Sequence, residues 1–189
     1  SWTEVADLNT TRGTCAGAGI TTAALCIGGL KPSFRDETET FDGSSWTEVG
    51  DLNSARNQLT GGGTTTAALV CGGENPTAYN SITETWNGTS WTEVNNLNTA
   101  RINAGGSGLQ TSFLCYGGAT PSVTVNTEEF DGVSWTEVAN LSTGRTDLAY
   151  GSQGTQASCL ATGGTSPGPT FYNNTEEWTK GQNVKVITD

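Results

Sequence analysis

The sequence predicts an all-β fold built from four similar antiparallel sheets. The first observation is internal repetition, which should be sought before any other pattern. Ser-Trp-Thr-Glu-Val occurs four times in 189 residues, and its tryptophans are Trp2, Trp46, Trp91 and Trp135. The second observation is composition. Gly, Thr, Ser and Asn are abundant; Gly and Asn suit tight turns, whereas Thr and Val suit pleated strands. No stretch of useful length favours a helix.

Three further landmarks follow each tryptophan in a fixed order. They are an arginine ten residues later, a Gly-Gly pair, and a Thr-Glu-x-aromatic segment. The arginines are Arg12, Arg56, Arg101 and Arg145, and the glutamates of the third landmark are Glu39, Glu84, Glu128 and Glu176. We therefore divide a single domain, 1–189, into repeats of about 1–44, 45–89, 90–133 and 134–180, with a strand-like tail at 181–189.

Each repeat is predicted to form four strands. In the first repeat these are a Gly- and Ala-rich strand within 12–19, an apolar strand at 23–27, a third strand at 38–41, and a fourth at 45–49. Asp42-Gly43 precedes the fourth strand, and Asp-Gly favours the tight turn of a hairpin. One such sheet cannot bury both of its faces. The sheets must therefore stack, and a radial stack closes as a four-bladed β-propeller with its small residues at the crowded centre.

The fourth repeat lacks its tryptophan strand. Thr38, Thr83 and Thr127 are each followed by a tryptophan eight residues later, but Asn183 takes that place after Thr175. We expect the strand 1–5 to complete the fourth sheet beside Glu176 and so close the ring. In the alternative, the tail near 182–186 completes this sheet. The strand 1–5 then joins a neighbouring unit in a strand-exchanged oligomer, because an unpaired edge seeks a partner.

These landmarks resemble the kelch repeat of the galactose-oxidase-like propellers. The shared features are the arginine before the first strand, the Gly-Gly pair, the Glu-x-aromatic segment and the tryptophan strand. The detailed sequence of the repeats looks even more like that of the repeats in large surface and tail-fibre proteins of marine phages and bacteria. The resemblance covers essentially the whole chain and implies a propeller fold. Two features depart from it: kelch propellers usually have more than four blades, and galactose oxidase needs copper-binding histidines.

Composition excludes several functions. The chain contains no histidine, which removes Ser-His and Cys-His catalysis, histidine-ligated metals and the oxidase chemistry. We expect no enzyme activity and no cofactor. A formal charge of -11 disfavours nucleic acid as a partner. No apolar run reaches about 18 residues, so we expect no membrane insertion. The chain begins with Ser1 and shows no signal-peptide pattern, so we expect a processed product or part of a longer protein.

The repeat arginines and glutamates are candidate structural ion pairs. We expect each arginine to pair with the glutamate of its third strand, and these pairs to lock one blade to the next, because an unpaired buried arginine is costly. The alternative is a positive ring around the central channel that binds an anion. The carboxylates are poor candidates for a glycosidase pair, since a residue that recurs in every repeat lacks the asymmetry of an active site.

The five cysteines read mainly as small buried residues. Cys26, Cys71, Cys115 and Cys159 lie in the apolar second strands, where a free cysteine behaves as a small hydrophobe. A hairpin that turns at Ile20-Thr21 places Cys15 opposite Cys26. We expect two free thiols there, and a disulfide is the alternative if the protein is extracellular.

The segments between the Gly-Gly pairs and Thr-Glu vary most among the repeats. We name these segments, 30–37, 74–82, 119–126 and 165–174, the variable loops. They share one face with the connections between repeats. Exposed aromatic residues on proline-containing loops are typical of contacts with carbohydrate or protein. The candidate ligand-binding residues are Phe34, Arg35, Tyr79, Asn80, Phe171 and Tyr172.

We therefore expect a non-catalytic recognition or adhesion module. Its partner is a glycan or a protein surface, and it belongs to a virion fibre or a cell-surface protein, in an extracellular or virion-surface location. The alternative is a structural subunit of a virion or filament, which assembles with further copies or with a larger parent structure through strand exchange or edge contacts.

Overall fold

The computed structural model describes residues 1–148, 154–166 and 170–181, and these residues form four antiparallel sheets and no helix. Sheet 1 contains β1 (Ala16–Ile20), β2 (Ala23–Leu30), β3 (Phe34–Phe41) and β4 (Trp46–Glu48). Sheet 2 contains β5 (Thr60–Gly63), β6 (Ala68–Cys71), β7 (Thr83–Trp86) and β8 (Trp91–Val94). Sheet 3 contains β9 (Gly105–Leu109), β10 (Ser112–Tyr116), β11 (Thr127–Phe130) and β12 (Trp135–Glu137). Sheet 4 contains β13 (Gly154–Thr155), β14 (Ser158–Thr162) and β15 (Thr175–Thr179).

Each sheet is a meander in which consecutive strands pair. The turn between β3 and β4 shows why the sequence folds this way. One carboxylate oxygen of Asp42 accepts hydrogen bonds of 2.8 Å from the backbone N–H groups of Ser44 and Ser45. A short polar side chain that captures its own backbone stabilises a tight turn. The all-β prediction and the order of the strands are confirmed.

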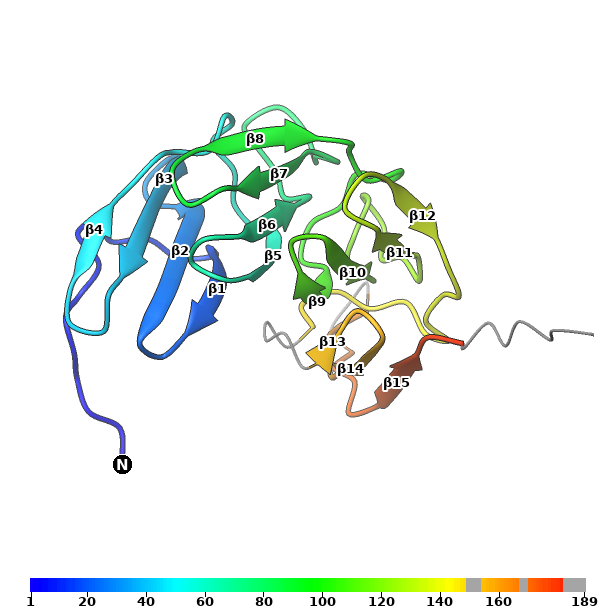
Figure 1. The fold of residues 1–189 in the computed structure, drawn as a ribbon. Coiled ribbons are helices and arrows are strands. Elements are labelled where there is room, and N and C mark those ends of the chain that lie inside the picture. The colour runs from blue at the N-terminus through cyan, green and yellow to red at the C-terminus, as the bar shows by residue number, and fades with distance from the viewer. Residues whose placement is uncertain (149–153, 167–169, 182–189) are drawn as a thin grey trace, which may run out of the picture.

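The sheets follow one another in an arc (Figure 1), with β1 packed on β5, β5 on β9 and β9 on β13. A leucine of the second strand marks each junction. Leu25, Leu69 and Leu114 are at most 3% exposed because the next sheet covers them. The equivalent Leu160 of sheet 4 is 41% exposed. The apolar core therefore consists of layers between consecutive sheets, and the outer face of sheet 4 is uncovered.

The Gly-Gly pairs set the spacing between consecutive sheets. Gly72 has a φ of +69°, and a Cβ atom at this position would lie 2.6 Å from the carbonyl oxygen of Arg101 in the next repeat. The N–H of Gly73 donates a 2.8 Å hydrogen bond to that same oxygen. The first glycine thus makes room for the neighbouring backbone, and the second one binds it.

A second series of backbone contacts runs along the arc. Four residues that follow the repeat arginines adopt left-handed conformations with φ of 53–54°, namely Thr14, Gln58, Asn103 and Asp147. The N–H of each donates to the carbonyl of the one before: Asp147 to Asn103 (3.3 Å), Asn103 to Gln58 (3.0 Å) and Gln58 to Thr14 (3.0 Å). Non-glycine residues hold this conformation only where surrounding contacts fix it.

The predicted closed ring is not present in the described residues. Ser1–Val5 belongs to no strand, and Trp2 is fully exposed. The reason is visible at the other end of this segment, where the indole N–H of Trp46 donates to the carbonyl of Ala6 (3.2 Å). This contact anchors the chain beside sheet 1 directly after Ser1–Val5, whereas β15 lies at the opposite end of the arc (Figure 1). The alternative strand near 182–186 lies outside the described residues.

Candidate functional site

The four repeat arginines pair with the four repeat glutamates. Arg56 contacts Glu84 at 2.7 Å, and both side chains are fully buried. Arg12 pairs with Glu39, Arg101 with Glu128, and Arg145 with Glu176. The second guanidinium nitrogen of Arg56 donates to the carbonyls of Gly72 (2.8 Å) and Ile82 (2.9 Å). The arginine side chains are therefore buried against the strands of their own sheets and do not line a positive channel.

The glutamates also bind the chain that enters each sheet. In sheet 1 the other carboxylate oxygen of Glu39 accepts hydrogen bonds from the backbone N–H (2.7 Å) and the side-chain amide (2.9 Å) of Asn9. Burial raises the pKa of Glu39, but the N–H donors of Asn9 and Thr10 outweigh it and lower the pKa below its ordinary value. The Glu39 carboxylate is thus held in its ionised form, and both of its oxygens are bound by Arg12, Asn9 or Thr10.

The prediction that these pairs lock one blade to the next is wrong. Arg12 and Glu39 belong to the same repeat, and the same holds for the other three pairs. The link to the next sheet uses the arginine backbone instead, because the Gly29 N–H donates to the Arg56 carbonyl at 2.8 Å. Each arginine therefore pairs within its own sheet through its side chain, and Arg56, Arg101 and Arg145 also contact the preceding sheet through their backbone carbonyls.

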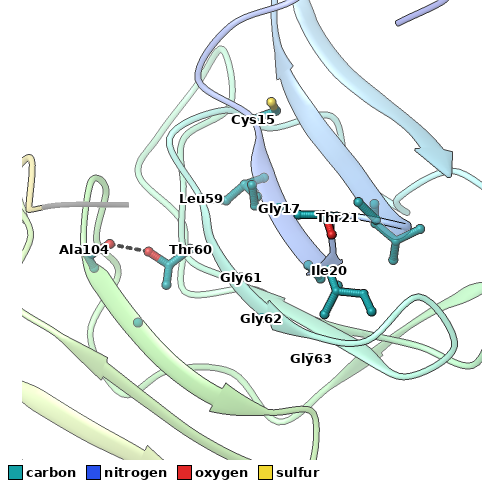
Figure 2. Close-up of a pocket in the computed structure, with 16 residues that line it drawn as sticks. Cys15, Gly17, Ile20, Thr21, Leu59, Thr60, Gly61, Gly62, Gly63 and Ala104 are labelled. Atoms are coloured by element: carbon teal, nitrogen blue, oxygen red, sulfur yellow. Dashed lines mark hydrogen bonds between the residues drawn. The ribbon is translucent and has the colours of Figure 1, made fainter. Parts of the chain in front are cut away.

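A hollow of about 520 Å³ lies along the inner strands, a feature that the sequence did not predict. Figure 2 shows it bounded by β1, by the glycines of β5 and by Ala104, with a hydrogen bond between the Thr60 hydroxyl and the Ala104 carbonyl. Its wall is mainly backbone and small side chains, and its one titratable group is the Cys15 thiol. The three consecutive glycines Gly61–Gly63 were the signal in the sequence.

Cys15 and Cys26 lie together, with a distance of 3.1 Å between their sulfur atoms, and both are free thiols. The predicted register is wrong by two residues: Ile20 faces Ala23, so that Cys26 faces Gly17 and reaches Cys15 diagonally. The hydrogen bond from Cys26 lowers the pKa of Cys15 to about 7, and the same bond together with burial raises the pKa of Cys26. Cys15, which is half-buried, is therefore the thiol suited to react.

The variable loops place one side chain at an equivalent position in each repeat. A β-bridge joins the residue after each Gly-Gly pair to this position, as in Glu74 with Tyr79 and Thr165 with Phe171. The residues at this position are Phe34, Tyr79, Val123 and Phe171. Phe171 is 81% exposed and Tyr79 38% exposed. The loops also lie beside the connections between repeats, since the Arg56 N–H donates to the Arg35 carbonyl (2.9 Å).

The other three loop candidates are held by their own surroundings. The Arg35 guanidinium donates to the Lys31 carbonyl at 2.7 Å and pairs with Glu37 at 2.8 Å. The Asn80 amide donates to the carbonyl of Ala78 at 3.1 Å. The ring of Tyr172 lies 6.0 Å from the guanidinium carbon of Arg145. The exposed aromatic residues are therefore the stronger candidates for ligand contact.

Two further features were sought in the part of the chain that the structure describes, a metal site and a membrane-spanning helix. That part contains no group of three or more potential metal-ligating side chains. It also contains no helix that is long and apolar enough to cross a membrane.

The comparisons with known proteins add no family to these observations. No protein-family model matches this chain, and no curated protein matches it.

Proposed function

We propose that this chain is a non-catalytic recognition module that binds a glycan or a protein surface through its variable loops, on a virion fibre or a cell surface. The observation that carries the proposal is the equivalent loop position, which presents Tyr79 and Phe171 on a constant frame. Exposed aromatic rings offer a large contact area at a small cost in side-chain entropy. The repeat carboxylates are all occupied by arginine, which leaves no free carboxylate pair among them for hydrolysis.

The proposed scaffold is a kelch-like, four-bladed β-propeller. In it the four sheets are the blades, and a Ser1–Val5 strand, from the same chain or from a second copy, adds to the outer edge of β15 to complete sheet 4 and close a ring of sheets. Two findings support this arrangement. Sheets 1 to 3 all end on a tryptophan strand, whereas the described part of sheet 4 ends on β15. The one further tryptophan strand, Ser1–Val5, is unpaired.

A glycan array and a cell-binding assay test the loop proposal. The variants are Phe34→Ala, Tyr79→Ala, Phe171→Ala and Tyr172→Ala. Leu109→Ala is the matched control, because Leu109 is an exposed apolar residue (59%) at the end of β9, away from the loops. We expect Tyr79→Ala and Phe171→Ala to weaken binding about 30-fold or more, as removal of an anchoring aromatic residue does. Unchanged binding in all four loop variants contradicts the proposal.

A structural subunit that assembles by strand exchange is the second candidate. It is favoured by the same unpaired tryptophan strand, which is available to another copy. The two candidates use different surfaces and are compatible with each other.

A further inference from the structure

The junction between sheets 3 and 4 lacks a side chain that the preceding junctions contain. Trp91 and Trp135 are 5% and 6% exposed, because each inserts between its own sheet and the sheet before it. The core between sheets 3 and 4 consists of Leu114, Tyr116, Leu148, Cys159 and Ala161, with Trp178 at its margin. No tryptophan of a fourth strand belongs to this core in the described residues.

A groove lies where that tryptophan is missing. Its lining includes Leu114, Tyr116 and Thr127 of sheet 3, and Cys159, Ala161 and Trp178 of sheet 4. The equivalent residues of sheets 2 and 3, Leu69, Cys71, Phe113, Cys115 and Phe130, surround Trp135. The volume of the groove is about 60 Å³. The rest of an indole would lie along the edge strand, as Trp135 lies against Phe130 with ring centroids 5.1 Å apart.

The groove also contains a threonine hydroxyl equivalent to those that accept a hydrogen bond from the tryptophan indoles of the other sheets. The N–H of Trp91 donates to the hydroxyl of Thr38 in the preceding sheet, and that of Trp135 donates to Thr83, each at 3.0 Å. Thr127 is the equivalent threonine of sheet 3 and lines the groove. The site is therefore built for a tryptophan on a strand, and the register of the other sheets places it opposite Trp178.

The Ser1–Val5 strand has the sequence that fits. It repeats the Ser-Trp-Thr-Glu-Val of the strands that fill the other junctions, and Trp2 is fully exposed. Sheets 1 and 4 are also each uncovered on one face. Trp46 of sheet 1 is only half-buried, because no sheet precedes it, and Leu160 of sheet 4 is 41% exposed, because no sheet follows it.

Seating the strand brings these two uncovered faces together. In the sheets themselves, a tryptophan is followed seven residues later by the residue that binds the glutamate of the next sheet, as Trp46 is followed by Asn53 on Glu84. Trp2 and Asn9, which binds Glu39, have the same spacing. A sheet 4 that accepts Trp2 must therefore pack against the sheet 1 that follows Trp2.

Within one chain these two sheets lie at opposite ends of the arc (Figure 1). The three junctions between them are closed by buried leucines and by the glycine-to-arginine hydrogen bonds. Bringing sheet 4 onto sheet 1 of the same chain requires these packed junctions to rearrange, which close packing resists. Contact with a second copy leaves these three junctions as they are and requires only the Ser1–Val5 segment to form a strand.

We propose that the groove between sheets 3 and 4 is the receptor for the Ser1–Val5 strand of a second copy of this chain, in a head-to-tail contact. This inference rests on the proposed completion of sheet 4 by that strand and is independent of ligand binding at the variable loops. A head-to-tail contact closes into a ring of copies or extends as a filament.

Sedimentation velocity of the full chain over a range of concentrations tests the assembly. We expect the sedimentation coefficient of the unchanged chain to rise with concentration, and Trp2→Ala to remain monomeric throughout. Leu109→Ala is the control for loss of an exposed apolar side chain and should assemble like the unchanged chain. Tyr79→Ala should also assemble normally, which separates this contact from the loop-face function.

A labelled peptide with the sequence of residues 1–9 tests the groove directly, with the full-length Trp2→Ala protein as receptor. We expect saturable binding, weakened about 30-fold or more when the peptide tryptophan is replaced by alanine. Because this change leaves the receptor intact, misfolding cannot explain the loss. Adding Thr127→Val to the receptor should weaken binding while its circular dichroism stays unchanged.

Three results overturn the proposal. If the unchanged chain is monomeric at every concentration and the receptor does not bind the peptide, the groove is not a strand site. If the chain is monomeric but the peptide binds, the strand of the same chain fills the groove. If association appears only after removal of residues 182–189, the tail is its occupant.

Discussion

The buried ion pairs make single residues decisive for stability. Glu84 is completely buried and contacts Arg56 as well as the backbone N–H (2.8 Å) and side-chain amide (2.7 Å) of Asn53. Glu84→Ala leaves the buried Arg56 without its counter-charge, so we expect a loss of about 3–5 kcal/mol in the free energy of unfolding. Chemical denaturation measures it. Glu48→Ala, which removes an exposed carboxylate from β4 of sheet 1, should cost less than about 0.5 kcal/mol.

The turn residue Asp42 connects stability to pH. Hydrogen bonds from the N–H groups of Ser45 and Ser44 lower its pKa from 3.8 to about 2. Because the folded pKa is below the unfolded one, this carboxylate stabilises the fold above pH 3.8 and loses that effect as the pH falls towards 2. The pKa values of Glu39 and Glu176 are also lowered, from 4.5.

We therefore expect the free energy of unfolding to fall as the pH drops from about 4.5 to about 2. Asp42→Asn should show a smaller fall over the lower part of this range, measured by urea denaturation at each pH. An identical pH profile for the variant and the unchanged chain contradicts the role assigned to Asp42.

Cys15 should be the first cysteine to react. Its pKa of about 7 places it largely in the thiolate form at pH 8, whereas burial raises the pKa of Cys159 to about 11. Alkylation followed by mass spectrometry should label Cys15 before the other four cysteines, with a rate that rises through pH 7. In Cys26→Ala the hydrogen bond is lost, and the midpoint of this rise should move towards 9.0. An unmoved midpoint rules out Cys26 as the cause.

At the scale of single elements, the Gly-Gly segment is the connection whose substitution should cost the most stability. Gly72→Ala forces a left-handed alanine and places its Cβ atom 2.6 Å from the Arg101 carbonyl oxygen. We expect a loss of about 2–4 kcal/mol, from backbone strain together with overpacking. Gly13→Ala is the control, because nothing lies within 4 Å of its Cβ position, and it should be nearly neutral. Thermal unfolding followed by circular dichroism compares the two.

Sequence reasoning predicted the strands well because turn chemistry and alternation are local. Asp42-Gly43 separates β3 from β4 as predicted, whereas β2 continues through Gly28-Gly29 to Leu30 and β3 begins at Phe34 instead of Thr38. The Arg–Glu partners were also accessible, since a recurring buried charge needs a recurring counter-charge. Register was less accessible: the hairpin between β1 and β2 turns at Thr21-Thr22, and moving the turn by one residue changed every pairing. The hollow along the inner strands left a local signal in Gly61–Gly63, but its extent and the groove beside Trp178 depend on packing between sheets.

At the scale of the whole molecule, the position of a sheet in the arc should determine what its residues contribute. Leu114 and Leu160 are equivalent, but Leu114 is 1% exposed and Leu160 is 41% exposed. Leu114→Ala should cost about 2–5 kcal/mol because it leaves a cavity. Leu160→Ala should cost less than about 1 kcal/mol at concentrations where copies are separate. Equal losses in chemical denaturation contradict an uncovered last sheet.

Three backbone hydrogen bonds join the left-handed residues of consecutive repeats: Gln58 donates to Thr14, Asn103 to Gln58, and Asp147 to Asn103. Because donor and acceptor recur identically in every repeat, the chain of bonds does not specify how many repeats there are. A duplicated repeat inserted between two others finds the same carbonyl acceptor in the repeat before it and the same N–H donor in the repeat after it. Gene duplication or deletion of whole repeats can therefore lengthen or shorten this protein in evolution without redesign of its interior.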